Sequence, residues 1–464
     1  MSAVGLHLLD AALAMASDGS LLSSAPSVVH ADPARATIMG HLAVDIARLA
    51  PRQVSSEHWA TIARETDRTQ PTGLALVRAV AVARAELRAR IDDTLRATPV
   101  QCAVSAAFSS QSLGVILALA RHEGIRIGGF HDAAALAVAS VGLTGATLVL
   151  ELGLAHVVAT RVEQVDGQLR RRAAVVRRGA GLLALRQSWL RMVGEAMVLR
   201  TRFDPLHEAA SEQRLHDLLD DAAARAAMSG STDLELPTSR DPVRVSLSRD
   251  QFAEAADDIY REVLAALHEL RPAGSRVNIL IDETATRLPG LLGRLAALRG
   301  CRFYFCSSSL IARAASLAAA TVADDGTVTL QRGYQAGTAL EAASELDLST
   351  LTNFIDTAPT HALWEGRAFV LPQRSTLEIG RDPVSGGIRL GQGFAGVSRL
   401  HCSLRAEDGT VTLIPHSEQD TWLNDERVRG RVRVQSGDRL RLGAPGVSIE
   451  LIAVGGVGHG TPQR

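Results

Sequence analysis

The sequence predicts a multidomain protein in which an α/β domain is followed by a small all-β domain. Up to about residue 325, helical stretches rich in alanine, leucine and arginine alternate with short apolar strands, which is typical of α/β proteins. From about residue 361 the pattern changes to short strands and turns with few helix formers, which is typical of a β-sandwich. With 464 residues, the chain is long enough for two or three domains with buried cores.

Several elements of the α/β part can be placed in order along the chain. The strongest are three strands and two helices, with strands at 101–108, 145–153 and 276–283 and helices at 112–124 and 288–300. After the second strand, two alternating segments flank Asp166-Gly167, a dipeptide that favours a tight hairpin turn. Residues 340–361 begin with helix formers, which predicts a short helix leading into a threonine-rich linker.

The composition excludes several classes of function. The chain has no lysine, so all 49 cationic side chains are arginine, which excludes lysine Schiff-base chemistry and Walker-type phosphate loops. The net charge of −1 gives no bulk attraction to nucleic acid or to an anionic membrane. We expect neither a signal peptide nor a membrane span, because the N-terminus lacks a positive segment and no long apolar run follows. Four scattered cysteines suit a reducing compartment, so we expect a cytoplasmic protein.

The expected hairpin carries a cluster of five arginines, namely Arg170, Arg171, Arg172, Arg177 and Arg178. They could bind an acidic partner or a nucleic acid, or they could form a solvated strand face. Only 3% of the residues are aromatic, so nucleic-acid bases would find few rings on which to stack. We therefore favour a solvated face and expect no nucleic-acid partner.

The segment GVSRLHCSL, residues 396–404, places Ser398, Arg399 and His401 within four residues. Such a cluster could form a nucleophile with its base, a metal site or an anion-binding site. Ser398 has no paired acid in the sequence that would complete a catalytic triad, so we expect no catalytic residue and no metal here. A planar arginine with hydroxyl and backbone donors is instead suited to a phosphate dianion.

The C-terminal part also shows a specific order of motifs over residues 363–454. Gly380-Arg381 follows one strand, Ser-Arg-Leu-His precedes the next, and a polar turn leads to Trp-Leu-Asn. This order resembles the forkhead-associated (FHA) domain, a β-sandwich that reads phosphothreonine peptides. The resemblance implies that Arg381 and Ser398 hold the phosphate and that Arg399 adds charge. It further implies that the loops are supported by Gly380, His401 and Asn424.

One run departs from the pattern of that family. Ser417-Glu418-Gln419-Asp420-Thr421 stands where the family has Ser-x-Asn-Gly-Thr, so Gln419 replaces an asparagine that contacts the peptide backbone. By the resemblance, Gln419 and Thr421 join the peptide-binding set. Glu418 and Asp420 place negative charge near an anionic ligand, which predicts weaker binding or a preference for peptides with basic flanks. A sandwich used only as an assembly surface is the alternative.

The α/β part contains segments in the order found in one chaperone family. CAVSAAFSSQ begins at residue 102, LVLELGLAHVVATRV at residue 148 and ILIDETATRLPG at residue 279. These segments resemble the strand–helix segment, the second phosphate loop and the adenosine loop of DnaK-type 70-kDa heat-shock chaperones. The resemblance spans residues 1–322 and implies the actin-like, two-lobed ATPase fold.

The residues that handle ATP in that family are replaced in this chain. In the first phosphate loop His7 stands in place of the aspartate and Asp10 in place of a hydroxyl residue. In the second loop Glu151 stands in place of the aspartate, and Gly153 is retained. The residues after Gly153 are leucine and alanine instead of two further glycines, which a loop close to phosphates would need.

The adenosine loop is altered as well, because Glu283-Thr284 replaces a glycine pair. Phosphoryl transfer depends on positioned cations, carboxylates and Mg²⁺. We therefore expect a pseudo-ATPase that uses neither ATP nor Mg²⁺ as a cofactor.

Three functions are open at this point. The first is a phosphothreonine-dependent adaptor, which implies a serine/threonine kinase pathway and a second protein partner on the actin-like domain. The second is a divergent ATP-binding or ATP-hydrolysing chaperone-like protein regulated by phosphopeptide, with Glu151 as its carboxylate and Asp10 as an Mg²⁺ ligand. The third is a filament or assembly subunit. The expected domains are 1–322, a linker at 323–362, the FHA domain at 363–454 and a flexible tail at 455–464.

Overall fold

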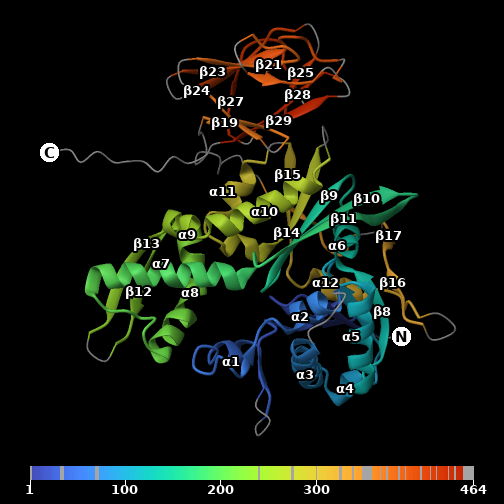
Figure 1. Ribbon diagram of the computed structural model, residues 1–464. Coiled ribbons are helices and arrows are strands. Elements are labelled where there is room, and N and C mark those ends of the chain that lie inside the picture. The colour runs from blue at the N-terminus through green and yellow to red at the C-terminus, as the bar shows by residue number, and fades with distance from the viewer. Residues whose placement is uncertain are drawn as a thin grey trace. The chain divides into compact units, whose positions relative to one another are not determined.

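The residues group into two compact units, each described here by itself (Figure 1). The computed structural model describes residues 3–452 apart from 32–35, 68–72, 239–240, 273–275, 299, 323–326, 337–338, 347, 349–357, 366, 373–374, 385–386, 392, 395, 408–409, 418–419, 425, 437 and 444–445. The first unit comprises residues 1–271, 277–292 and 302–346, and the second comprises 347–464 with the short segments 272–276 and 293–301. The expected tail at 455–464 lies outside the described residues.

The first unit contains a six-stranded sheet whose strands run in the order β3-β2-β1-β7-β8-β16. The strands are β1 (Val4–Leu8), β2 (Leu13–Ser17), β3 (Ser20–Ala25), β7 (Val100–Val104), β8 (Ile127–Asp132) and β16 (Leu330–Gln331). The first three form an antiparallel meander, and β7 pairs in parallel with β1 and with β8. The strand expected at 101–108 is confirmed as β7, which ends four residues earlier because a turn and the Ser109 helix cap follow it.

Several helices lie among and after these strands in the chain, and two of the longer ones begin at side-chain caps. They are α1 (His41–Val44), α2 (His58–Thr66), α3 (Gly73–Arg90), α4 (Asp93–Arg96), α5 (Ser110–His122) and α6 (Ala133–Val141). The Ser109 hydroxyl caps α5 and the Asp132 carboxylate caps α6, each accepting a hydrogen bond from the helix backbone. Three short strands, β4 (Val29–His30), β5 (Ile38–Met39) and β6 (Val54–Ser55), form a separate small sheet.

The second large sheet of this unit repeats the same central strand order. Its order is β17-β11-β10-β9-β14-β15-β18, with β9 (Thr147–Leu152), β10 (His156–Val165), β11 (Gln168–Arg178), β14 (Val277–Asp282), β15 (Cys301–Cys306), β17 (Gly333–Gln335) and β18 (Ser344–Leu346). Here β9, β10 and β11 form the meander, and β14 pairs in parallel with β9. The predicted hairpin is confirmed, with Asp166 and Gly167 both at positive φ in its turn.

Further elements lie between residues 182 and 317 of the chain. They are α7 (Leu182–Thr201), α8 (Ala209–Ser229), β12 (Ser231–Leu236), β13 (Val243–Ser248), α9 (Arg249–Ala255), α10 (Asp257–Leu270), the 3₁₀ helix η1 (Glu283–Arg287), α11 (Leu291–Ala296) and α12 (Leu310–Leu317). The helix α10 buries an apolar stripe against β10 and β11. Strands β12 and β13 form a separate hairpin whose side chains alternate between buried and exposed.

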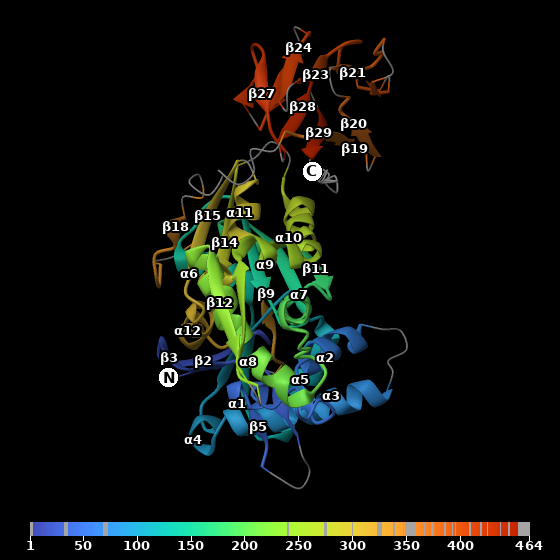
Figure 2. The same ribbon diagram turned by 90° about the vertical axis from the view of Figure 1, so that its left-hand side faces the viewer.

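The last helix, α12, connects the two sheets of the first unit. It contacts β1 and β2 of the first sheet and also α6, and Figure 2 shows it beside β2 and β3. The approach to β1 is so close that a Cβ on Gly5 would overlap the carbonyl oxygen of Ala312 and the amide nitrogen of Ser316. Only glycine therefore permits this contact.

The segment expected as a linker at 323–362 is in part a component of these sheets, which corrects that expectation. Strand β16 pairs with β8, β17 with β11, and β18 with β15, so residues 330–346 belong to the first unit. The prediction of a short helix at the start of 340–361 is also wrong. Residues 344–346 form a strand, because pairing with the edge strand β15 overrides local helix propensity.

Four of the five arginines of the hairpin have polar partners within the first unit. Arg171 lies 3.1 Å from the Asp132 carboxylate, and Arg172 and Arg177 face Glu163 and Glu269 respectively. Arg170 donates to the side-chain oxygen of Gln168. Most of the charge on this strand face is therefore compensated within the chain.

The second unit consists of two sheets of mostly antiparallel strands around one core, as the sequence predicts, and only β22 among the described strands pairs in parallel, with β21. One sheet has the order β20-β19-β29-β28-β25-β26 and the other β22-β21-β23-β24-β27. The strands are β19 (His361–Trp364), β20 (Arg367–Val370), β21 (Thr376–Gly380), β22 (Ile388–Arg389), β23 (Cys402–Glu407), β24 (Thr410–Pro415), β25 (Thr421–Leu423), β26 (Glu426–Arg427), β27 (Val432–Val434), β28 (Arg439–Leu442) and β29 (Val447–Ile452). Alternate side chains from both sheets fill one core, among them Ile379, Leu404, Leu413, Leu440 and Ile449.

Neither membrane helices nor disulfides occur in the part of the chain that the structure describes. All four cysteines are free thiols, and burial raises the pKa of Cys102 and of Cys402 to about 12. Among residues 3–452, with the gaps given above, no helix is both long enough and apolar enough to cross a bilayer.

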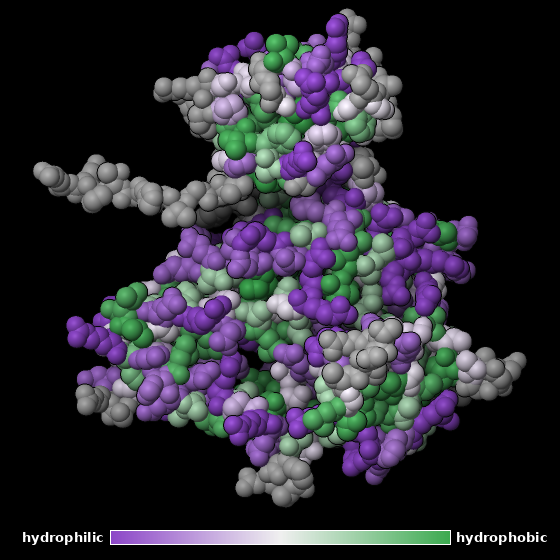
Figure 3. All heavy atoms as spheres, in the orientation of Figure 1, coloured by the Kyte–Doolittle hydropathy of each residue, from purple (hydrophilic) through white to green (hydrophobic). Residues whose placement is uncertain are grey.

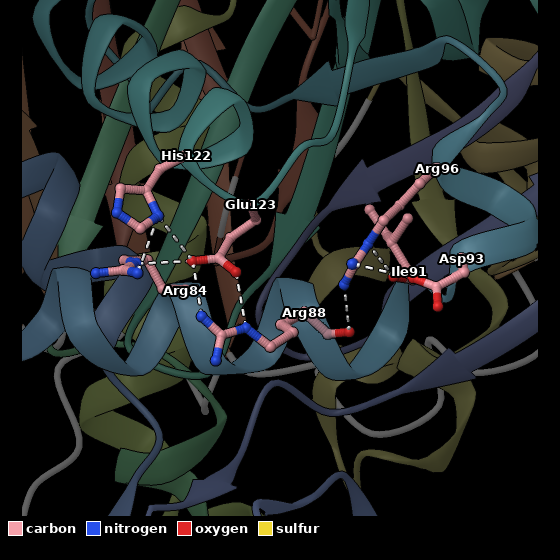
Figure 4. A network of polar contacts seen from close by, with 7 residues as sticks. All are labelled: Arg84, Arg88, Ile91, Asp93, Arg96, His122 and Glu123. Atoms are coloured by element: carbon pink, nitrogen blue, oxygen red, sulfur yellow. Dashed lines mark hydrogen bonds and ion pairs between the residues drawn. The ribbon is translucent and has the colours of Figure 1, made fainter.

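A buried carboxylate joins α3 to the end of α5 (Figure 4). Glu123 accepts hydrogen bonds from Arg84 at 2.8 Å and from Arg88 at 2.7 Å, and its side chain is only 4% exposed. Hydrogen bonds from Arg88 and Arg84 lower the pKa of Glu123 to about 2. The network thus fixes two helices that cover the first sheet.

We expect Glu123→Gln to lower the free energy of unfolding by about 1–2 kcal/mol, because it removes charge-assisted hydrogen bonds to two arginines. Since the pKa of Glu123 is lowered in the folded state, its stabilisation should be complete above about pH 4.5 and decline as the pH falls toward 2. Urea unfolding measures both effects. The matched control is Glu235→Gln, which breaks an exposed pair with Arg244 and should change stability by less than about 1 kcal/mol. Equal effects of the two substitutions would contradict the role given to Glu123.

Candidate functional sites

The turn after β21 and the loop before β23 are joined by their backbones. The Arg381 amide donates to the Ser398 carbonyl, and the Asp382 amide donates to the Arg399 carbonyl, both at 3.0 Å. Gly380 makes this possible, since a Cβ there would overlap the Arg399 carbonyl. The sequence-predicted residues Gly380, Arg381, Ser398 and Arg399 are therefore neighbours, although nearly twenty positions separate the two segments.

Hydroxyl groups meet at this junction. The Ser398 and Ser417 Oγ atoms lie 2.6 Å apart, which places Ser417 in the site although the sequence argument assigned it no role. The signal that could have identified it is its position in the polar turn before β25. The side chain of Arg381 is half-buried, and among the described residues its Nε has no hydrogen-bond acceptor. Arg399 is exposed. Backbone hydrogen bonds thus bring the arginine-bearing turn to the serine-bearing loop, and a guanidinium and hydroxyls are donors suited to an oxyanion.

His401 lies inside the domain and holds the loop from within. Its side chain is fully buried, and its Nδ1 accepts a hydrogen bond of 3.2 Å from the Ser398 amide. Its carbonyl accepts hydrogen bonds from the amides of His416 and Ser417. Burial lowers the pKa of His401, which favours the neutral ring that this acceptor role requires. His401 therefore connects both serine-bearing loops and does not face a substrate.

Asn424 and Thr421 lie on the strand that follows the polar turn, and neither presents its side chain to the junction. Asn424 has a φ of 48°, donates to Asp438 at 2.7 Å and accepts from the Arg439 amide at 2.9 Å. These contacts fix the turn after β25. Thr421 is buried, and its hydroxyl is enclosed in the domain without a hydrogen-bond partner among the described residues. Its burial argues against the peptide-contacting role expected for it.

Asp420 was expected to place negative charge near the ligand, but in the structure its carboxylate has a cationic partner. The carboxylate of Asp420 pairs with Arg427 at 2.5 Å, so its negative charge is compensated within the unit. Glu418 and Gln419 lie outside the described residues.

In the first unit, Asp10 does not take the place expected for a residue near phosphates or for an Mg²⁺ ligand. Its buried carboxylate accepts hydrogen bonds from the Leu154 amide at 2.7 Å and from the Ala155 amide at 3.5 Å. Gly153 leaves the necessary space, because a Cβ there would lie 2.7 Å from an Asp10 oxygen. Burial raises the pKa of Asp10, and the nearby His156 and these two amides oppose that shift. Asp10 thus binds the loop that resembles the second phosphate loop of the chaperone family.

His7 and Glu151 face each other at the ends of β1 and β9. Their nearest nitrogen and oxygen atoms are 3.8 Å apart, and both side chains are 4% exposed. Neither the ring nitrogens of His7 nor the carboxylate oxygens of Glu151 have a hydrogen-bond partner among the described residues. Two buried polar groups are therefore left unsatisfied at one place, which is rare in folded proteins.

The expected adenosine loop forms the short helix η1. Asp282 caps it by accepting a hydrogen bond of 2.7 Å from the Thr284 amide, and burial raises the pKa of Asp282. Glu283 accepts a hydrogen bond of 3.3 Å from the Ser308 amide. The Glu283 carboxylate and the Thr284 amide are thus both hydrogen-bonded within the chain.

A cavity of about 540 Å³ lies among these segments of the first unit. His7, Glu151, Asp282 and Thr284 line it together with residues of α1, α7 and α8. Figure 3 shows the surface hollowed between α8 and α1. Its volume lies in the range of small-molecule sites.

A second buried polar cluster has the composition of a catalytic triad but not its geometry. His58 Nε2 lies 3.1 Å from the Ser27 hydroxyl and 2.7 Å from Glu86, so one ring nitrogen serves both neighbours. A triad instead requires the base to use opposite nitrogens. Trp59 and Arg90 also donate to Glu86, whose pKa is about 2 despite the opposing effect of burial, because His58, Arg90 and Ser27 favour the charged form. The cluster is fully enclosed and acts as internal structure.

Comparison with known proteins supports one of the two resemblances. The model of the FHA domain matches residues 377–443, a stretch that contains the junction of Arg381, Ser398 and His401. No curated protein matches the chain. The C-terminal segment is thus supported as a phosphothreonine-binding protein-interaction module, and its partner is a phosphothreonine-containing protein.

We expect protection of the Ser398 loop from hydrogen exchange to depend on pH through His401. Because its folded-state pKa lies below the ordinary value of about 6.5, stabilisation by the neutral ring should be complete above that pH and decline below it. Exchange of a peptide covering residues 396–404, corrected for intrinsic rates, measures this at pH 7.5 and 5.5. His401→Gln keeps an acceptor without a titrating ring, so its protection should not respond to pH in the same way. An identical response in this variant would exclude His401 as the cause.

We expect Asp10→Ala to lower the free energy of unfolding by about 1–3 kcal/mol, because it leaves the Leu154 and Ala155 amides without their acceptor. Asp10→Asn keeps an acceptor oxygen and should lose less. Chemical unfolding followed by circular dichroism provides the comparison. Glu262→Ala removes an exposed carboxylate paired with Arg177 and serves as the control, with an expected change below about 1 kcal/mol. A loss for Asp10→Ala no larger than for the control would rule out the proposed contact.

Proposed function

We propose that the protein is a phosphothreonine-dependent adaptor, in which the FHA module binds a phosphorylated partner and the first unit is an actin-like domain without ATP chemistry. The single observation that carries the first half is the junction at β21 and β23. There the backbone of the Arg381 turn is hydrogen-bonded to the Ser398 loop, the Arg381 Nε has no partner among the described residues, and the Ser398 and Ser417 hydroxyls lie 2.6 Å apart. A phosphate dianion has the acceptor oxygens for all three groups, and its charge makes the bond to the guanidinium stronger than that of a neutral acceptor.

The actin-like assignment of the first unit is supported by its internal repetition. The orders β3-β2-β1-β7-β8 and β11-β10-β9-β14-β15 are the same when each strand is numbered within its own half. The helix α12 returns from the second half to pack on β1, and the hairpin of β12 and β13 is inserted in the second half alone. Two such halves are the arrangement implied by the resemblance to DnaK-type chaperones.

The residues in and around the cavity of the first unit do not fit a nucleoside triphosphate. Its phosphates would need free backbone amides, but Asp10 already bonds the amides of Leu154 and Ala155. The two arginines that line the cavity are both paired, Arg186 with Asp220 and Arg287 with Asp221. Among the residues that the structure describes there is no group of three or more side chains able to hold a metal ion. These contacts support a first unit kept for its shape and its surface, with a second protein as its partner.

We expect a degenerate phosphothreonine peptide library to bind the full chain with micromolar affinity in isothermal titration, and its unphosphorylated counterpart not to bind. Arg381→Ala should weaken binding by at least about tenfold, because a charge-assisted pair contributes about 1.5–3 kcal/mol. Ser417→Ala should weaken it by a smaller factor. The matched control is Arg405→Ala, since Arg405 is an exposed arginine beside Thr376, at the far end of the same two strands.

Two results would contradict the proposal. Absence of binding by the wild type would leave the module as an assembly surface. Equal losses for Arg381→Ala and Arg405→Ala would mean that general positive charge, and not the junction, attracts the peptide.

A further inference from the structure

We propose that the cavity of the first unit binds a small organic amine with an apolar body. The proposal goes beyond phosphopeptide reading and rests on different residues. Its starting point is the pair His7 and Glu151, which are buried, line the cavity and lack hydrogen-bond partners among the described residues. Buried polar groups without partners are expected to have a ligand or water.

The charges around the cavity select for a cation. Six carboxyl groups line it, namely Asp45, Glu151, Asp217, Asp220, Asp221 and Asp282. The only arginines in the lining are Arg186 and Arg287, and each is paired with one of these aspartates. The histidines His7, His41 and His216 line the cavity as well. Burial lowers the pKa of His216 to about 4, so His216 adds no positive charge at neutral pH. An anion would therefore meet uncompensated carboxylates in a site of low dielectric constant.

Two of these carboxyl groups lie side by side near His7. Strands β9 and β14 are parallel, and Leu150 is paired with Ile281, so Glu151 and Asp282 are the next residues on neighbouring strands. Their backbones are about 4.8 Å apart, as in any sheet. An ammonium group has three donors and no acceptor, which matches two carboxylates and a ring nitrogen. It would also offset the desolvation that raises the pKa of Asp282.

The rest of the wall is suited to an apolar body. It includes Leu9, Val44, Leu182, Leu185, Trp189 and Ile311. A ligand that buries a ring or an aliphatic group against these side chains gains from the hydrophobic effect, while its amine is held at the opposite side. A hydrated metal ion would make no use of this surface.

The test uses the full chain with phenethylamine and tryptamine as probes, compared with 3-phenylpropionate, 2-phenylethanol and ATP with Mg²⁺. Thermal unfolding and isothermal titration measure binding. We expect both amines to raise the unfolding temperature in a saturable way and to bind at least tenfold more tightly than the matched acid and alcohol. Glu151→Gln should weaken amine binding by more than tenfold.

Two further variants keep the test decisive. If Glu151→Gln fails to fold, Asp282→Asn gives the same readout, and Ala12→Leu should reduce binding by filling the cavity from its half-buried rim. Arg381→Ala should bind the amines as the wild type does, so that failure here is distinct from failure of phosphopeptide binding. Stabilisation by ATP with Mg²⁺, equal binding of acid and amine, or no binding of either amine would each overturn the proposal.

Discussion

The hydrogen bonds from the Leu154 and Ala155 amides to the Asp10 carboxylate are the constraint on which the organisation of the first unit depends. Asp10 follows β1 in one half of the unit, and the two amides that donate to it follow β9 in the other, so the contact joins the two sheets. Burying a carboxylate is costly unless hydrogen bonds and nearby positive charge compensate for the lost water. Here the two amides and His156 offset part of that cost, although burial still raises the pKa of Asp10. The same contact engages the two backbone amides of the loop that follows β9.

In the C-terminal unit, a buried histidine and backbone hydrogen bonds hold the loops that carry Arg381 and Ser398. His401 uses one ring nitrogen to accept from the Ser398 amide, and two backbone bonds hold the Gly-Arg turn to the same loop. The same framework brings the Arg381 turn to the loop of Ser398, whose hydroxyl lies 2.6 Å from that of Ser417. Donors that are fixed before binding lose little entropy when an anion arrives. One chain therefore holds an internal anion in its first unit and a place for an external one in its second.

Close backbone approaches set the architecture in both units. Gly5 lets α12 pack directly on β1, and Gly380 lets the turn after β21 contact the Ser398 loop. Strand β16 then extends the first large sheet at one edge, and β17 and β18 extend the second at both edges, so the first unit is completed only after the chain has passed α12. The edges of β8, β11 and β15 are thereby covered, which protects strands that would otherwise expose unpaired backbone groups.

The sequence by itself determined the two fold classes, the strands at the centre of both large sheets, the Asp166-Gly167 hairpin and the grouping of Gly380, Arg381, Ser398 and His401. These features depend on local periodicity, on turn residues or on a short ordered motif, all of which can be read along the chain. Tertiary structure alone decided that Ser417 joins the site, that Thr421 is buried and that residues 344–346 form a strand. It also decided that Asp10 bonds a loop 144 positions away. The reason is physical: a side chain's partner and its exposure depend on segments that are distant in sequence, and local propensity does not contain that information.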